Sequence, residues 1–322
     1  MDTSILKGNK KEIYDYLWKD SVFDFDVVKT GESDPSYEFE FGGKDLTTIV
    51  GESLANNFAI SEPDKKTFIE KFKMACSGNG EELRKITTMH SSSLCALLFF
   101  FRNKKLHMID CVFEESYFEF KNKVIGYPSN VDIVLLGKNK EGKKVILFLE
   151  SKFSEYITGI TKTKNKYEIG KSYFKEGCYS EPIYNELFKN KMLIKQDDTH
   201  ISAEKDMYIE GIKQIISHYY GIRNFMNKKY YEKDNDNLEK VKDHGAEEFI
   251  LGEIVFDNFS DTLKNKYLVH YENDYSTLAG IINKQCDKEC PNLRVLEKTL
   301  HYSDLQEFIS DLPEVHKFYF GK

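Results

Sequence analysis

Two apolar runs separated by a short polar turn constrain the fold of this 322-residue chain more than any other feature. The runs are SNVDIVLLG at 129–137 and KKVILFLESKF at 143–153, with KNKEG between them. Runs this short and this apolar are typical of strands buried in a sheet, and Glu141 and Gly142 suit a tight turn. The sequence therefore predicts a buried antiparallel hairpin.

Further elements are expected on either side of the hairpin. HSSSLCALLFFF at 90–101 predicts a buried helix capped by Ser91 or Ser92, and CVFEESYFEF at 111–120 predicts a strand. After the hairpin, the residues at 202–226 have the apolar spacing of a long helix, and EFILGEIVF at 248–256 has the pattern of a core strand. The predicted order is helix, three strands, helix, strand. LRVLEKTL and SDLQEFISDL near the end of the chain suggest C-terminal helices.

The length and the 40% hydrophobic content are enough for one sizeable core with elaborations. We expect residues 1–88 to form an α/β extension packed on this core. Residues 89–260 would form the core itself, with a lysine- and tyrosine-rich insertion near 161–199. Residues 261–322 would form a mainly helical extension.

Composition narrows the setting in which the protein works. The N-terminus lacks the pattern of a signal peptide, and no apolar run approaches the roughly 20 residues that cross a bilayer, so we expect a cytoplasmic protein without a membrane partner. The net charge of −7 argues against indiscriminate coating of nucleic acid but leaves room for a local basic groove. Cys286 and Cys290 are the one close cysteine pair, and a zinc site there would have to recruit His270 or His301.

The second strand of the hairpin ends in three polar residues, Glu150, Ser151 and Lys152. Side chains alternate along a strand, so Glu150 and Lys152 share a face, and Asp132 on the partner strand is expected opposite Glu150. Two neighbouring carboxylates favour a hard divalent cation between them, and we predict Mg²⁺, with Mn²⁺ as a substitute. The main-chain carbonyl of Ser151 would be a further ligand, and Lys152 would orient or deprotonate the attacking water. The alternative is a solvated strand end without chemistry.

These residues carry a family resemblance. Asp132, Glu150 and Lys152, in the form D…E-S-K on adjacent strands of an αβββαβ core, resemble the PD-(D/E)XK nuclease superfamily. HSSSLCALLFF, YFEFKNKVIGYPSNVDIVL and ESKFSEY together are similar to a group of bacterial restriction-endonuclease-like proteins, over about residues 89–226. The resemblance implies an α/β restriction endonuclease-like fold, with a mixed central sheet flanked by helices. One departure is that Val131 precedes the aspartate, while the nearest proline is Pro128.

The resemblance also implies two further site residues: an upstream acid and a polar group on the helix after the lysine strand. Glu119 fits the first, with Glu115 as runner-up, and Gln214 fits the second, with His218 one turn on. Gly211, on the same helix face, would let the helix approach the sheet closely. Gln214 and His218 could instead satisfy buried backbone or core contacts. Two residues with weaker claims are His90, at the helix N-terminus, and Glu155, in the family-like ESKFSEY.

The segment TKTKNKYEIGKSYFKEG at 161–177 interleaves lysines with aromatic residues, a pattern that suits contact with a nucleic-acid backbone. The candidate contacts are Lys162, Lys164, Lys166 and Lys171. Because only four of the 46 basic residues are arginines, a lysine-biased solvated loop explains the segment equally well.

The sequence predicts a Mg²⁺-dependent endodeoxyribonuclease acting in restriction, defence or DNA processing. Two alternatives stay open. One is a catalytically silent nucleic-acid-binding or assembly protein that keeps the fold, and the other is cleavage of RNA. Many enzymes of this fold cut both strands as homodimers, so a homodimer is a further expectation.

Overall fold

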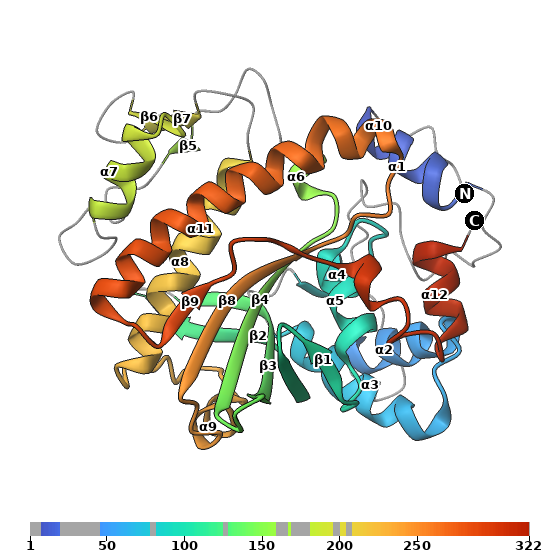
Figure 1. Cartoon of the computed structure of the whole chain (residues 1–322). Helices are drawn as coiled ribbons and strands as arrows, with labels where there is room; N and C mark the ends of the chain where they lie inside the picture. Colours follow the sequence, from blue (N-terminus) through green and yellow to red (C-terminus); the bar gives the residue numbers. More distant parts are fainter. Residues whose placement is uncertain are drawn as a thin grey trace.

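The computed structural model has a mixed sheet at its centre with helices on both faces (Figure 1). Near the two ends of the chain, helix α1 (Asn9–Leu17) contacts helix α12 (Pro313–Phe320). The structure describes residues 8–19, 46–77, 82–124, 128–158, 167–168, 181–195, 200–203 and 208–321.

The central sheet has the order β1-β2-β3-β4-β8-β10, and β9 also pairs with β8. Strands β1 to β4 pair antiparallel, whereas β8 is parallel to β4, β9 and β10. A parallel neighbour needs a crossover connection, and the chain between β4 and β8 contains the long helix α8. The strands are β1 (Leu106–Met108), β2 (Cys111–Lys123), β3 (Pro128–Asn139), β4 (Lys144–Lys152), β8 (Glu248–Val255), β9 (Leu293–Val295) and β10 (Leu300–His301).

The predicted hairpin is confirmed. Ile133 on β3 pairs with Leu149 on β4, and the two strands stay in register up to the turn. Gly142 adopts a φ of 82°, a left-handed value that favours glycine, and its N–H donates to the Asn139 carbonyl at 3.0 Å. Strand alternation then directs Ile146 and Phe148 into one core cluster and Leu147 and Leu149 into the other.

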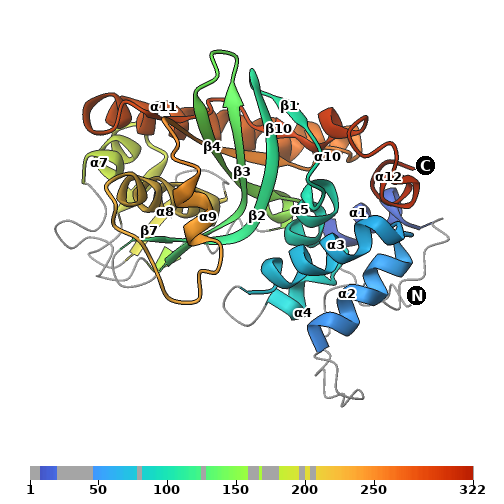
Figure 2. The ribbon, with the colours of Figure 1, turned by 90° about the horizontal axis from the view of Figure 1, so that it is seen from below.

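Two helical layers cover the two faces of the sheet, as the view from below shows (Figure 2). The first layer contains α1 (Asn9–Leu17), α2 (Leu46–Asn57), α3 (Glu62–Ala75), α4 (Glu82–Ile86), α5 (Ser92–Phe100) and α12 (Pro313–Phe320). The second layer contains α7 (Glu181–Lys189), α8 (Ile209–Met226), α9 (Leu238–Asp243) and α11 (Val269–Glu289). The sheet is therefore buried on both sides, which fits its nearly continuous apolar strands.

Helix α5 forms where the sequence predicts it. Ser91 is the N-cap, and its side chain accepts a hydrogen bond from the Leu94 N–H at 3.0 Å. Every residue from Leu94 to Phe100 is buried, so the helix is apolar on all sides. The elements α5, β2, β3, β4, α8 and β8 follow one another in the predicted order.

The regions around the core differ in part from expectation. The described part of residues 1–88 contains helices α1 to α4 and no strand. The predicted helix in LRVLEKTL is wrong, since Leu293–Val295 pairs with β8 as β9 and Leu300–His301 pairs with it as β10. Leu293 and Val295 are buried and Arg294 is exposed, which is the two-residue period of a strand.

SDLQEFISDL forms a 3₁₀ turn, Tyr302–Leu305, followed by further turns before α12. The described residues after 260 are still mainly helical, because α11 alone spans 21 residues.

Three short segments complete the described fold. The first is α6 (Glu155–Thr158), which directly follows β4, and the second is α10 (Asp261–Leu263) with the π-helical turn Lys264–Leu268 before α11. The third is a small sheet of order β5-β7-β6, formed by β5 (Tyr167–Glu168) and β6 (Leu193–Lys195) in the insertion and by β7 (His200–Ala203) just after it. Among the described residues, no helix is both long enough and apolar enough to cross a membrane.

Candidate active site

Asp132 and Glu150 lie level with each other just beyond the end of the β3–β4 ladder. Ile133 and Leu149 are the last paired residues, and Asp132 and Glu150 are the next residue on each strand. Beyond this point the strands no longer share a ladder, and the Ser151 N–H donates instead to Asp132 Oδ2 at 2.7 Å. The predicted approach of Asp132 to the Glu150 end of β4 is confirmed.

Glu150 and Lys152 lie side by side on one face of β4, as strand alternation predicts. Lys152 Nζ donates to Glu150 Oε1 at 2.6 Å, and both residues are buried. Lys152 Nζ also donates to Gln214 Oε1 at 2.7 Å, which joins β4 to α8. The structure therefore brings Gln214 to the lysine, where the resemblance implies it.

Helix α8 approaches the sheet through a glycine, but at a different position from the one expected. A Cβ at Gly221 would lie 2.7 Å from Asn122 Cβ and 3.5 Å from Ser129 Cβ, so only glycine fits there without a shift. A Cβ at Gly211 would meet the Tyr208 ring and the Tyr271 hydroxyl, neither of which belongs to the sheet. The expectation for Gly211 is wrong, because the close contact occurs further along the helix.

Glu119 reaches the site through an unusual backbone conformation. It lies on β2 between the pairs Phe118–Ile133 and Phe120–Val131, and so stands opposite Asp132. Its φ of 50° interrupts the alternation of the strand, so that Phe118 and Phe120 enter different core clusters although they are two residues apart. A left-handed conformation is unfavourable for a residue with a Cβ, and such strain is characteristic of functional positions.

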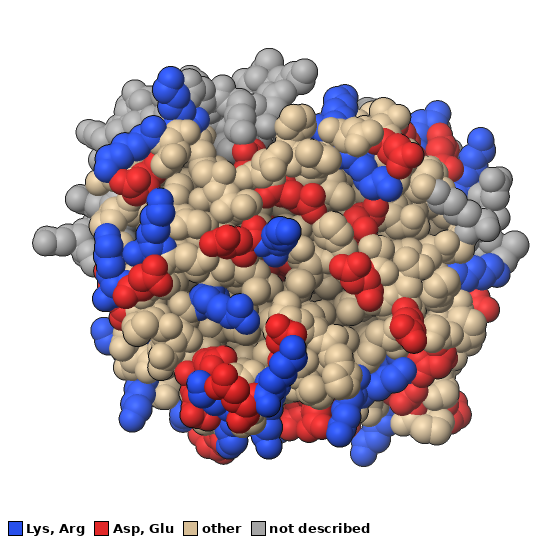
Figure 3. Space-filling view, in the orientation of Figure 1, with Lys and Arg blue, Asp and Glu red and all other residues tan. Residues whose placement is uncertain are grey.

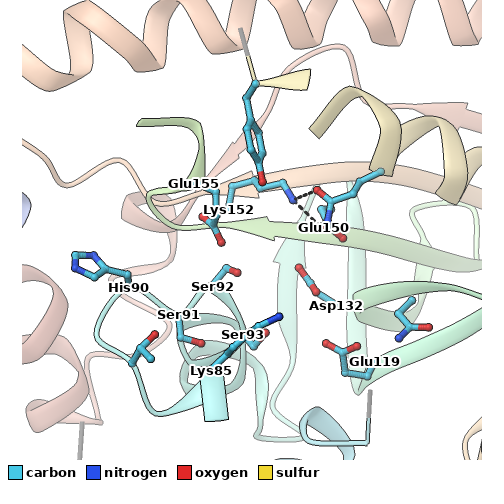
Figure 4. A pocket seen from close by; sticks show the side chains of 14 residues that line it. Lys85, His90, Ser91, Ser92, Ser93, Glu119, Asp132, Glu150, Lys152 and Glu155 are labelled. Atoms are coloured by element: carbon cyan, nitrogen blue, oxygen red, sulfur yellow. Dashed lines mark hydrogen bonds and ion pairs between the residues drawn. The ribbon is translucent and has the colours of Figure 1, made fainter. Parts of the chain in front are cut away.

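These side chains line one pocket of about 410 Å³ (Figure 4). Acidic groups from β2, β3, β4 and α6 line one part of it, and the loop before α5 with the first residues of that helix lines another. All five predicted catalytic residues are included. The lining residues are Lys85, Thr88, His90, Ser91, Ser92, Ser93, Glu119, Asn130, Asp132, Glu150, Lys152, Glu155, Tyr208 and Gln214.

Burial gives these groups unusual acid–base properties. Burial and the charge of Glu150 raise the pKa of the Asp132 carboxyl well above its usual range. Burial also opposes the charge of Glu150, but Lys152 and His218 outweigh it and lower the pKa of Glu150 to about 2. The same pairing overcomes the burial of Lys152 and raises its pKa above the ordinary lysine value. Lys152 therefore stays protonated at neutral pH.

The donor set fits a hard divalent cation. Asp132 and Glu150 supply carboxylate oxygens, and the charge of one disfavours ionisation of the other, a conflict that a cation relieves. In an extended strand the N–H and C=O of one residue point the same way, so the Ser151 carbonyl faces the edge where its N–H meets Asp132. Each carboxylate oxygen has two lone pairs, so Glu150 can keep its hydrogen bonds and still bind metal.

Within the described ranges, no three His, Cys, Asp or Glu side chains come together as a ready-made metal cluster. The zinc site considered for Cys286 and Cys290 is not assembled among these residues. His301 instead has Nε2 at 2.5 Å from Glu272 Oε1. Any protein ligands at the pocket would therefore be two carboxylates and a carbonyl, with water completing the coordination.

The structure adds Ser129, which sequence reasoning did not name, and connects it to Glu150 through His218, which the sequence places one turn after Gln214. His218 Nε2 lies 2.8 Å from Glu150 Oε2, and its Nδ1 lies 2.6 Å from the Ser129 hydroxyl. The spacing of His218, one turn after Gln214 on the same helix face, was the available signal. Ser129 had no signal of its own, since a serine at the start of a strand is ordinary.

Of the remaining sequence candidates, some line the pocket and others do not. Glu155 lines the pocket and accepts hydrogen bonds from the N–H groups of Phe153 and Ser154. Glu115, the runner-up to Glu119, accepts from the Tyr117 hydroxyl at 2.6 Å and is not among the residues of the pocket. Lys162, Lys164, Lys166 and Lys171 lie outside the described residues.

Comparison with protein-family models, with curated proteins and with solved structures found no match to this chain.

Proposed function

We propose that the chain is a divalent-metal-dependent nuclease that hydrolyses phosphodiester bonds of DNA, of the restriction or defence endonuclease type. The observation that carries the proposal is the convergence of Asp132, Glu150 and Lys152, from neighbouring strands, in one polar pocket. Its resemblance to the PD-(D/E)XK pattern, on elements in the order α5, β2, β3, β4, α8 and β8, supports a restriction endonuclease-like core.

Asp132, Glu150 and the Ser151 carbonyl would hold the ion, and Mg²⁺ suits these oxygen donors. A divalent cation bound there would supply Lewis-acid chemistry, polarising the phosphoryl group and lowering the pKa of a bound water. Lys152 is protonated, so its role is to donate a hydrogen bond that orients the water or stabilises the charge developing on the phosphate. Gln214 holds the lysine from the side of α8.

Side chains that line the pocket, rather than a charged surface over the whole molecule, would hold the substrate. Acidic and basic side chains are interspersed over the described surface that Figure 3 shows, in keeping with the net charge of −7. Near the site, Lys85 and the serines at the start of α5 line the pocket opposite the acidic residues, which places hydrogen-bond donors within it. Contact between DNA and the lysines at 162–171 stays a prediction.

The test is nicking of supercoiled plasmid by the purified protein with Mg²⁺ or Mn²⁺, with EDTA as the metal-free control. Glu150→Ala should abolish cleavage. Lys152→Ala should bind the cation yet cleave about 10²–10³-fold more slowly, the cost of removing one donor to the transition state. Lys143→Ala is the matched control and should cleave like wild type, because Lys143 is an exposed lysine just before the start of β4, away from the site.

The competing function is a catalytically silent nucleic-acid-binding protein. It would be supported if DNA bound while no divalent ion bound at the acidic pair and no cleavage followed. The proposed metal and lysine chemistry acts on the phosphodiester that DNA and RNA share, so it does not by itself distinguish the two substrates. Parallel reactions with single-stranded RNA of the same sequence would show which of them is cleaved.

A further inference from the structure

A buried hydrogen-bonded relay stands behind Glu150. His218, on α8, is 2% exposed and bridges Glu150 on β4 to Ser129 at the start of β3. The two distances, 2.8 Å to Glu150 Oε2 and 2.6 Å to the Ser129 hydroxyl, are both those of strong hydrogen bonds. Neither His218 nor Ser129 lines the pocket, so neither is placed to touch a substrate.

The directions of these bonds follow from the donor inventory. An ionised carboxylate only accepts hydrogen bonds, so the proton shared with Glu150 belongs to His218 Nε2. With Nε2 protonated, the neutral ring has Nδ1 as its acceptor, and the Ser129 hydroxyl can donate to it. Ser129 thereby selects the tautomer that serves Glu150, as partners behind a metal-binding group commonly do.

The relay fixes the Glu150 carboxylate on both sides. Lys152 contacts Oε1 and His218 contacts Oε2, and together these bonds specify one orientation of the carboxylate plane. Without the histidine bond, Lys152 would still hold Oε1, but the carboxylate could rotate about that single contact. The helix contact at Gly221 supports the arrangement, because it brings α8 close to Ser129 one turn after His218.

We propose that Ser129 and His218 are positioning residues that hold Glu150 in the orientation required to bind the divalent cation. The inference rests on the proposed function, because it assigns these residues to the metal site of that reaction. It predicts that removing the Ser129 hydroxyl weakens metal binding, although neither Ser129 nor His218 would touch the cation.

The experiment uses Ser129→Ala in the full-length protein, with Ser129→Thr as the conservative variant that restores a hydroxyl. Ser116→Ala is the matched control, since Ser116 is also buried on the central sheet and its hydroxyl donates to the Phe100 carbonyl at 2.6 Å. Mn²⁺ affinity would be measured by calorimetry. The values of kcat and KM would be measured with a labelled DNA oligonucleotide, and thermal unfolding would show whether each variant is folded.

We expect Ser129→Ala to lose about 10-fold or more in Mn²⁺ affinity and in kcat, which is the effect typical of losing a hydrogen-bond partner behind a metal ligand. The KM for DNA should change little. Ser129→Thr should recover most of both quantities. Ser116→Ala should unfold at a lower temperature but bind Mn²⁺ as wild type does. His218→Gln should resemble Ser129→Ala if it folds.

A Ser129→Ala variant with wild-type Mn²⁺ affinity and kcat, in a background where wild type binds metal and cleaves, would overturn the positioning role alone. Equal losses in Ser129→Ala and Ser116→Ala would also overturn it, because the effect would then be a general cost of losing a buried hydroxyl. Wild-type protein that neither binds Mn²⁺ nor cleaves would overturn the proposed function and this inference with it.

Discussion

Lys152 Nζ lies 2.6 Å from Glu150 Oε1, in an ion pair whose side chains are only 3% and 4% exposed. Removing charges from water is costly, and here the cost is offset by the pairing itself and by the hydrogen bonds from His218 and to Gln214. The two residues therefore depend on each other for stability as well as for any chemistry.

The first prediction concerns this interdependence. Lys152→Met should lower the free energy of unfolding by about 3–5 kcal/mol, because Glu150 is left as a buried charge without its lysine partner. Adding Glu150→Gln should recover part of the loss, since the amide carries no charge. Urea denaturation of the two single variants and the double variant would measure this. Additive losses would contradict the expected coupling.

The second prediction concerns the packing of α8. Gly221→Ala should cost about 1–3 kcal/mol, because its Cβ would lie 2.7 Å from Asn122 Cβ and force the helix away from the sheet. The same shift should separate Gln214 and His218 from β4 and lower any cleavage rate.

Gly280→Ala on α11 is the control for this change. A Cβ there meets no atom within 4 Å, so alanine should be neutral or stabilise the helix by about 0.5–1 kcal/mol. If Gly280→Ala melted at a lower temperature than Gly221→Ala, the close contact between α8 and the sheet would not be important for stability.

The third prediction tests the backbone at Glu119. Glu119→Ala keeps a Cβ at a φ of 50°, whereas Glu119→Gly removes it, so the glycine variant should be more stable than the alanine variant by about 1 kcal/mol. Both lose the carboxylate and should lose activity to the same extent. Chemical denaturation and plasmid nicking separate the two effects, and a glycine variant less stable than the alanine variant would argue against strain.

The fourth prediction is a pH dependence of stability from Glu253, a buried residue of β8. Burial, with Lys152 and the Tyr271 hydrogen bond opposing it, raises the pKa of Glu253 to about 7 from an ordinary 4.5. The folded state then binds more protons than the unfolded state between these values, so stability is fully present below pH 4.5 and falls as pH rises to about 7.

Glu253→Gln should remove this part of the pH dependence, because the amide does not titrate and can still accept from the Tyr271 hydroxyl. At pH 8 the variant should be more stable than wild type by a few kcal/mol, from about 1.4 kcal/mol for each pKa unit, and at pH 4 the two should be close. Melting curves at both pH values would check this, and an equal difference at the two would refute it.

Much of the fold and the centre of the site followed from local patterns in the sequence. The short apolar runs at 129–137 and 143–153, with a glycine-containing turn between them, are sufficient to predict the β3–β4 hairpin, and strand alternation then puts Glu150 and Lys152 on one face. The turn length then fixes the register that brings Asp132 level with Glu150. Local sequence carries this information because hairpin partners are neighbours in the chain.

The remaining features depended on residues that are distant in the sequence. His218 and Glu150 are 68 positions apart and His218 and Ser129 are 89 apart, and no local pattern links them. Their contact depends on the packing of α8 against the sheet at Gly221. Likewise Leu293–Val295 forms a strand because β8 offers it an edge to pair with. The sequence by itself determined the hairpin and its charged end, whereas tertiary packing decided which distant side chains surround that end.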